Sequence, residues 1–95
     1  MATLPLLYAI WGDIVVADYN NHRIQVFDRD GKFMFKFGSE GKELGQFNYP
    51  CGVTVDQRNN QIVVADTYNH RIQIFDEKGI FLRVFGSNGK VMGNY

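Results

Sequence analysis

One long phrase is written twice in this chain, and that repeat restricts the possible folds more than any other feature. DYNNHRIQVFDRDG begins at Asp18, and DTYNHRIQIFDEKG begins at Asp66, 48 residues later. Aligning each residue with the one 48 positions on pairs 14–42 with 62–90, and both copies contain IVVAD, NHRIQ, FD and FGS. A period in the forties is typical of propeller blades or of helical arrays.

Differences between the copies indicate that both pack in the same way. Apolar positions change conservatively, as in Met34 and Leu82, which we expect to be buried. Polar positions change freely, as in Arg29 and Glu77. We also expect the recurring phenylalanines to be packing residues: Phe33, Phe37, Phe81 and Phe85.

Short β-rich runs separated by turn residues favour the propeller. In the second copy these runs are 52–56, 61–66, 71–76 and 81–86, and no stretch has the apolar spacing of a helix. Gly31 and Gly79 supply the positive φ of tight hairpins, and strand-ending aspartates such as Asp76 suit turns. The first two runs are apolar on both faces, as in a sheet covered on both sides. The sequence therefore predicts an all-β fold of four-stranded antiparallel blades.

The first copy lacks a clear first strand. Its other strands are expected at 13–18, 23–28 and 33–38, but the text near 4–8 does not resemble GVTVD, and Pro5 removes a ladder donor. Residues 1–12 are either a degenerate strand or a lead-in foreign to the repeat. We expect a first, partial repeat with its connection over 13–47, and a second repeat with the start of another connection over 48–95. Both ends look cut mid-pattern, as in a fragment of a longer propeller.

Composition limits the function classes only broadly. The 95 residues suit one small domain, and ten basic and ten acidic residues give a net charge of zero, which offers no bulk argument for nucleic acid or membrane. The single cysteine, Cys51, favours a reducing compartment, so we expect a cytoplasmic protein. No apolar run approaches the roughly 20 residues of a membrane helix.

At this point a family resemblance is plain. YPCGVTVDQRNNQIVVADTYNHRIQIFDEKGIFLRVFGSNGK resembles an NHL repeat, and the first copy resembles another without its opening strand. Asn21-His22 and Asn69-His70 match the triplet of the family name, with arginine in place of leucine. HRIQVF is similar to the NHL domains of tripartite-motif proteins. The resemblance covers Asp13 to about Lys90.

The resemblance implies a β-propeller, usually of six blades, that binds RNA or protein. A tripartite-motif parent can be a ubiquitin ligase through its RING domain, but one cysteine and two histidines cannot build a RING or B-box. We therefore expect no enzymatic activity and no cofactor from this chain. A lyase whose NHL-like blades hold zinc near the propeller axis is the enzyme alternative.

The histidines and aspartates are better explained by structure than by metal binding. Each copy offers one His and one Asp, His22 with Asp18 and His70 with Asp66, and a metal site needs further ligands at close range. We expect the aspartates and asparagines to tie the loops through hydrogen bonds from their side chains to the backbone.

Loops that crowd one end of the propeller, its top face, are the expected binding surface. Tyrosines there can stack on bases or fill a protein pocket, and basic residues can meet phosphates. The two arginines can instead pair with Asp18 and Asp66. The candidate ligand-binding residues are Tyr19, Asn20, Arg23, Lys42, Tyr49, Cys51, Thr67, Tyr68 and Arg71.

Two blades alone leave an apolar face open on each flank, and such patches imply a partner. Other blades of a parent chain are one such partner. If each blade turns the chain by a sixth of a circle, three copies of two blades would close a ring. We therefore expect the isolated, folded chain to form a cyclic trimer or a larger assembly.

Overall fold

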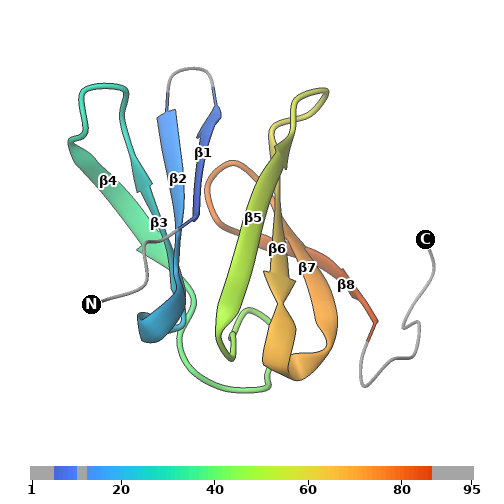
Figure 1. Cartoon of the computed structure of the whole chain (residues 1–95). Helices are drawn as coiled ribbons and strands as arrows, with labels where there is room; N and C mark the ends of the chain where they lie inside the picture. The colour runs from blue at the N-terminus through green and yellow to red at the C-terminus, as the bar shows by residue number, and fades with distance from the viewer. Residues whose placement is uncertain (1–5, 11–12, 87–95) are drawn as a thin grey trace.

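Two four-stranded antiparallel sheets make up the fold, in the order β1-β2-β3-β4 and β5-β6-β7-β8. The computed structural model describes residues 6–10, as backbone only, and 13–86. The sheets stand face to face, with β5 against β1 and β2 (Figure 1). No helix in these described ranges is long and apolar enough to cross a membrane. The strands are β1 Leu6–Ile10, β2 Asp13–Asp18, β3 Arg23–Phe27, β4 Phe33–Phe37, β5 Pro50–Asp56, β6 Gln61–Asp66, β7 Arg71–Phe75 and β8 Phe81–Phe85.

The first sheet does have a first strand, but its register departs from the repeat. Leu6 of β1 lies opposite Ala17, whereas Gly52 of β5 lies opposite Ala65, the equivalent of Ala17. The shift arises at the turn, because residues 11–12 alone separate β1 from β2, while 57–60 separate β5 from β6. Residues 6–10 thus form the first strand of this sheet, in a register that differs from that of the second copy. Residues 1–5, 11–12 and 87–95 lie outside the described parts of the chain.

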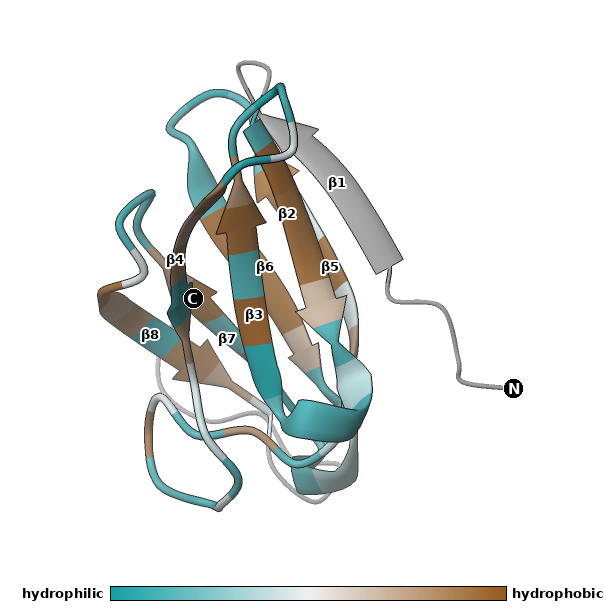
Figure 2. Ribbon diagram, turned by 90° about the vertical axis from the view of Figure 1, so that its left-hand side faces the viewer, coloured by the Kyte–Doolittle hydropathy of each residue, from teal (hydrophilic) through white to brown (hydrophobic). Residues whose placement is uncertain are grey.

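The core forms where one face of each sheet meets the other. Residues of β2 and β3 two apart lie on the same face of a strand and are buried together with residues of β5, β6 and β7. Figure 2 shows the apolar residues concentrated along the strands, and hydrophilic residues at the turns. The buried set is Val15, Ala17, Ile24, Val26, Phe47, Val53, Val55, Ile62, Val64 and Phe75.

Aromatic rings seal one edge of this core. Phe37 lies 4.8 Å from Phe75 and 6.4 Å from Phe47, measured between ring centroids. Gly38, at φ 97°, directs the chain into the connection 38–49, and a Cβ at this position would collide with the Phe47 ring. Phe47 donates its backbone N–H to Ser39 O over 2.8 Å. The connection is therefore held in one conformation.

The outer strands are more exposed than the sequence suggested. Met34 and Leu82 were expected to be buried but are 48% and 40% exposed, and Phe33 is 49% exposed. Each residue sits on β4 or β8, the strand at the edge of its sheet, where only one neighbouring strand covers it. Phe37 and Phe81 do pack against the core as expected.

The hairpin turns follow the predicted chemistry. Oδ1 of Asp28 accepts the backbone N–H groups of Asp30 and Lys32, each over 2.9 Å. Oδ1 of Asp76 accepts the equivalent groups of the second copy. Each turn then passes through a glycine with φ near 84°, as the sequence required.

Candidate functional site

Equivalent loops of the two sheets meet at one end of the molecule. A 3₁₀ turn follows β2 at Tyr19–Asn21, and another follows β6 at Thr67–Asn69. Both turns and the connection lie at the lower end in Figure 1. Each turn ends at a histidine in the left-handed region, His22 at φ 53° and His70 at φ 55°. This end is the top face predicted from the sequence.

The carboxylate of Asp18 organises the first loop. It accepts hydrogen bonds from Asn21 Nδ2 at 3.1 Å, Arg23 Nε at 2.9 Å and Gln25 Nε2 at 2.8 Å. Burial raises the pKa of this carboxyl, but the three donors outweigh it and leave the pKa below its ordinary value. Asp18 therefore does tie the loop, but the bonds run between side chains and not to the backbone as predicted.

Asp66 holds the equivalent set of donors, and it is fully buried. Asn69 Nδ2 lies at 3.0 Å, Arg71 Nε at 2.7 Å and Gln73 Nε2 at 3.1 Å from Oδ2. The backbone N–H of Asn48 donates to Oδ1 at 2.7 Å. The predicted pairing of both arginines with these aspartates is therefore present. We call Asp66, Asn69, Arg71 and Gln73 the connection clamp.

The connection clamp holds the backbone that joins the two sheets. Arg71 Nη1 donates to Lys42 O, and Nη2 donates to Glu43 O and Gln46 O, each at 2.9 Å. Gln73 donates to Gln46 O at 2.6 Å and accepts the N–H of Gly45 at 2.8 Å. The guanidinium of Arg71 is thus occupied by carbonyls and a carboxylate.

Three tyrosines from three separate segments form a strip across the boundary between the sheets. The ring of Tyr49 lies 5.1 Å from that of Tyr19 and 4.9 Å from that of Tyr68, between centroids. The Tyr68 side is the open end of the strip, since this residue is 58% exposed. Burial raises the pKa of the Tyr19 hydroxyl, and the neighbouring Tyr68 hydroxyl raises it further.

His22 is buried against the middle ring of this tyrosine strip. It is 8% exposed, and its ring lies 4.5 Å from the Tyr49 ring, edge-on. Nδ1 accepts the backbone N–H of Tyr49 at 3.0 Å, so the ring proton sits on Nε2, 3.9 Å from Oε2 of Glu40. The sequence offered no signal for this contact, which joins residues 27 positions apart.

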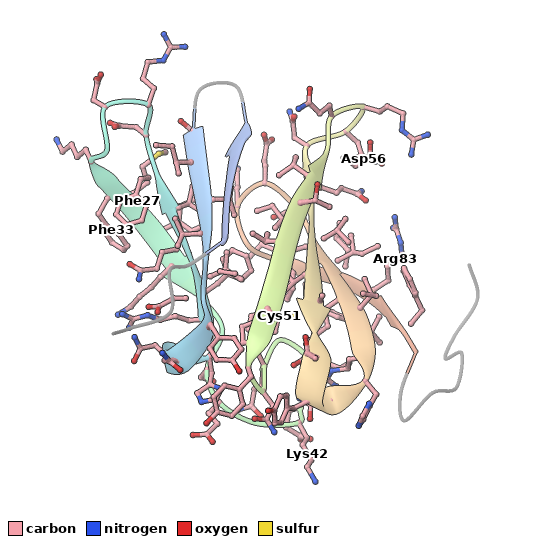
Figure 3. All side chains as sticks on the ribbon, in the orientation of Figure 1. Phe27, Phe33, Lys42, Cys51, Asp56 and Arg83 are labelled. Atoms are coloured by element: carbon pink, nitrogen blue, oxygen red, sulfur yellow. The ribbon has the colours of Figure 1, made fainter. Side chains whose placement is uncertain are left out.

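The other predicted residues surround the strip. The thiol of Cys51 is exposed and lies 2.7 Å from Thr67 Oγ1. Asn20 and Lys42 are exposed, and Figure 3 shows Lys42 at the loop end, pointing away from the body of the molecule. Arg23 is partly exposed and pairs with Asp18. Within the described ranges, no group of three His, Cys, Asp or Glu side chains is placed to hold a metal ion.

Two similar four-stranded sheets, repeated at 48 residues and packed face to face, define a class: these are blades of a β-propeller. The NHL repeat model matches residues 12–27 and 47–75, which together are slightly less than half of the chain. This match confirms the resemblance to NHL repeats that the sequence indicated.

Curated relatives share these repeats over short stretches. Protein brain tumor of Drosophila melanogaster is 52% identical over 50 residues, which cover 53% of this chain and 5% of that protein. The B-box type zinc finger protein ncl-1 of Caenorhabditis elegans is 76% identical over 25 residues, 26% of this chain and 3% of that protein. The RING finger protein nhl-1 of the same organism is 47% identical over 42 residues, 44% and 4% respectively. The matches thus span about a twentieth or less of these relatives.

A solved structure confirms the fold. A Bacteroides fragilis protein superimposes with a TM-score of 0.79 over 93% of this chain and 25% of its own, at 19% sequence identity. This likeness concerns the backbone arrangement alone.

Proposed function

We propose that the loop end of these NHL repeats is a protein-binding surface centred on Tyr19, Tyr49 and Tyr68. NHL repeats are binding modules, and the tyrosine strip is what this pair of repeats places at their boundary. Tyrosine gives a large contact area with few rotatable bonds and keeps a polar hydroxyl, so it is enriched among the residues that dominate interfaces. The exposed ring of Tyr68 carries the proposal.

Charge at this end favours protein over RNA. Binding to RNA backbones depends on cations that are free to meet phosphates. Arg71 instead donates to Asp66 and three carbonyls, and Arg23 donates to Asp18. Lys42 is exposed on the same connection as two exposed acids, Glu40 and Glu43, and the whole chain is neutral.

The test compares two probes on the same protein. Peptides selected from a random displayed library are expected to bind the wild type with little dependence on salt. Tyr68→Ala is expected to weaken them by about 30-fold, which corresponds to the roughly 2 kcal/mol of an aromatic hot spot. Arg58→Ala is the matched control, since Arg58 is exposed in a loop away from the strip and pairs locally with Asp56.

A random pool of single-stranded RNA, followed by fluorescence anisotropy, is the second probe. The proposal fails if the RNA binds with a steep salt dependence that disappears in Arg23→Ala and Lys42→Ala, while selected peptides ignore Tyr68→Ala.

The relatives named for a RING finger and a B-box zinc finger support one further step. We propose that these repeats belong to a cytoplasmic protein of tripartite-motif type, in which they hold the partner while other domains act on it. The full reading frame on both sides tests this directly, because it must then contain the Cys/His spacing of such zinc modules.

A further inference from the structure

The middle ring of the tyrosine strip is held by a buried group whose charge can change near neutral pH. Nδ1 of His22 accepts the backbone N–H of Tyr49 at 3.0 Å. A backbone N–H can only donate, so this nitrogen carries its lone pair and the imidazole is neutral. Imidazole is the side chain whose charge ordinarily changes between about pH 5 and 8. A proton on Nδ1 removes this hydrogen bond, because two donors then face each other.

The backbone of Tyr49 depends on such a hold. Its φ is 55°, in the left-handed region, which residues other than glycine adopt uncommonly. Tyr49 also precedes Pro50, the first residue of β5, and a proline favours an extended conformation in the residue before it. Sparsely populated conformations persist only where the surrounding structure holds them. Losing the bond to His22 therefore favours a change of conformation at Tyr49 itself.

The residue before Tyr49 is held by bonds that do not involve His22. Asn48 donates its backbone N–H to Asp66 Oδ1 at 2.7 Å, and its carbonyl accepts the backbone N–H of Tyr68 at 3.1 Å. The neighbouring loop also keeps its charge: despite burial, the hydrogen-bond donors hold the pKa of Asp18 below its ordinary value, so this carboxylate stays charged where imidazole titrates. Protonation of His22 is therefore expected to move one ring and leave the fold intact.

A carboxylate beside His22 can compensate the charge of the protonated ring. Oε2 of Glu40 lies 3.9 Å from Nε2, and the Glu40 side chain is 72% exposed. Burial raises the pKa of the nearby Tyr19 hydroxyl, so this phenol stays neutral and adds no charge. The titratable groups on the segments around His22 are Glu40 and Tyr49 on the connection, Asp18 and Tyr19 in its own loop, Arg23 on β3, and Tyr68 and Cys51 beyond the rings.

We propose that His22 is a pH-sensitive switch of the tyrosine strip, and this inference rests on the proposed function because it concerns regulation of the same surface. With a neutral ring, Nδ1 holds Tyr49, whose own ring contacts those of Tyr19 and Tyr68, and the strip binds its partner. With a protonated ring, the imidazolium pairs with Glu40 and Tyr49 leaves the left-handed conformation. The three rings then no longer form one surface, and the partner is released.

The chain offers a matched control and a suitable substitution. His70 follows the same Asn in the second copy and has φ 55°, against 53° for His22, but its side chain is exposed. Asparagine adopts the left-handed conformation more readily than most residues, so His22→Asn suits the backbone. Its side-chain oxygen can accept the Tyr49 N–H near the place of Nδ1, and it gains no proton in this pH range.

The first test measures peptide binding to the full chain by fluorescence anisotropy between about pH 7.5 and about pH 5.5. The probes are histidine-free peptides selected from the displayed library at the higher pH. Wild type is expected to lose about tenfold in affinity as the pH falls, roughly the effect of one hydrogen bond. His22→Asn is expected to lose this pH dependence, while His70→Asn is expected to keep it. Glu40→Gln, which removes the compensating charge, is expected to move the midpoint of the binding profile to lower pH.

NMR of the free protein tests the switch without a partner. Long-range ¹H–¹⁵N spectra of the two imidazoles are expected to show Nδ1 of His22 unprotonated and Nε2 protonated at the higher pH. As the pH falls, the amide resonance of Tyr49 is expected to shift with the same midpoint as the His22 ring. In His22→Asn the Tyr49 amide resonance is expected to stay in place over the same range.

The outcomes separate this inference from the proposed function. If selected peptides depend on Tyr68 but bind equally at both pH values, the switch is wrong and the binding surface stands. If no selected peptide depends on Tyr68, the proposed function fails, and the NMR titration still decides whether His22 controls Tyr49. A Tyr49 amide that does not follow the His22 ring, or a pH dependence of binding that persists in His22→Asn, would overturn the switch.

Discussion

Replacing Arg71 with alanine tests how the two blades are held together. The side chain is 9% exposed and joins the fully buried Asp66 to three carbonyls of the connection. Removing one partner of a buried ion pair leaves the other charge without compensation, which costs about 3–5 kcal/mol. Three further charged hydrogen bonds to backbone are lost at the same time. We expect the free energy of unfolding to fall by about 4 kcal/mol.

The repeat supplies its own control. Arg23 makes the equivalent bond to Asp18 at 2.9 Å, but the pair is partly exposed and the described chain does not run through its clamp. A partly exposed pair contributes about 0.2–1 kcal/mol, so Arg23→Ala is expected to cost less than about 1 kcal/mol. The difference in unfolding free energy between the two variants then measures how much Arg71 stabilises the connection, since both arginines make the same bond to their aspartate.

Urea unfolding followed by circular dichroism is the assay. The variants are expected to differ in midpoint while the slope of free energy against urea stays constant. A domain of this size has only about 5–15 kcal/mol in total, so Arg71→Ala can unfold outright. Arg71→Lys, which keeps the charge without the planar fork, should then show an intermediate loss. Equal costs for Arg71→Ala and Arg23→Ala would refute the reasoning.

One other pair of equivalent positions and one single substitution make further tests. His22→Ala leaves the backbone N–H of Tyr49 without its acceptor and should lower the free energy of unfolding by about 1–2 kcal/mol in the same assay. His70→Ala, at an exposed position, should cost close to nothing. Equal losses would contradict the role of His22. The folded pKa of Asp18 lies below 3.8, the unfolded value, so its contribution is present above pH 3.8 and is lost as the pH falls through the folded pKa. Asp18→Asn should therefore flatten the acid side of the stability profile, and an unchanged profile would exclude this contribution.

Strand positions were predictable because they depend on local chemistry. The runs 61–66, 71–76 and 81–86 agree with β6, β7 and β8 to within one residue. Turn glycines and aspartates marked the hairpins for the same reason. β5 begins earlier than predicted, at Pro50, where an irregular register brings it opposite Asp66.

Environments were not predictable, because identical residues in the two copies meet different neighbours. His22 is 8% exposed under Tyr49, while His70 is exposed. Arg23 and Arg71 have the same local sequence, but in the described chain the connection runs across Arg71 and not across Arg23, which is more exposed. These differences depend on contacts between residues 25 to 29 positions apart, and alternation along a strand carries no information about them.

The same distinction applies to the tyrosine strip. The tyrosine strip needs tyrosines at 19, 49 and 68, on three segments that meet at the inner boundary. In the sequence, the residues 48 positions from these tyrosines are Thr67, Met1 and Asn20, so the repeat does not encode a second set of tyrosines.

The binding surface therefore depends on a boundary that brings together residues from three separate segments. Tyr68→Ala should weaken the selected peptides without changing the midpoint of urea unfolding, because its side chain is 58% exposed. A loss of peptide binding that only followed a loss of stability would show that the strip serves the fold and not a partner.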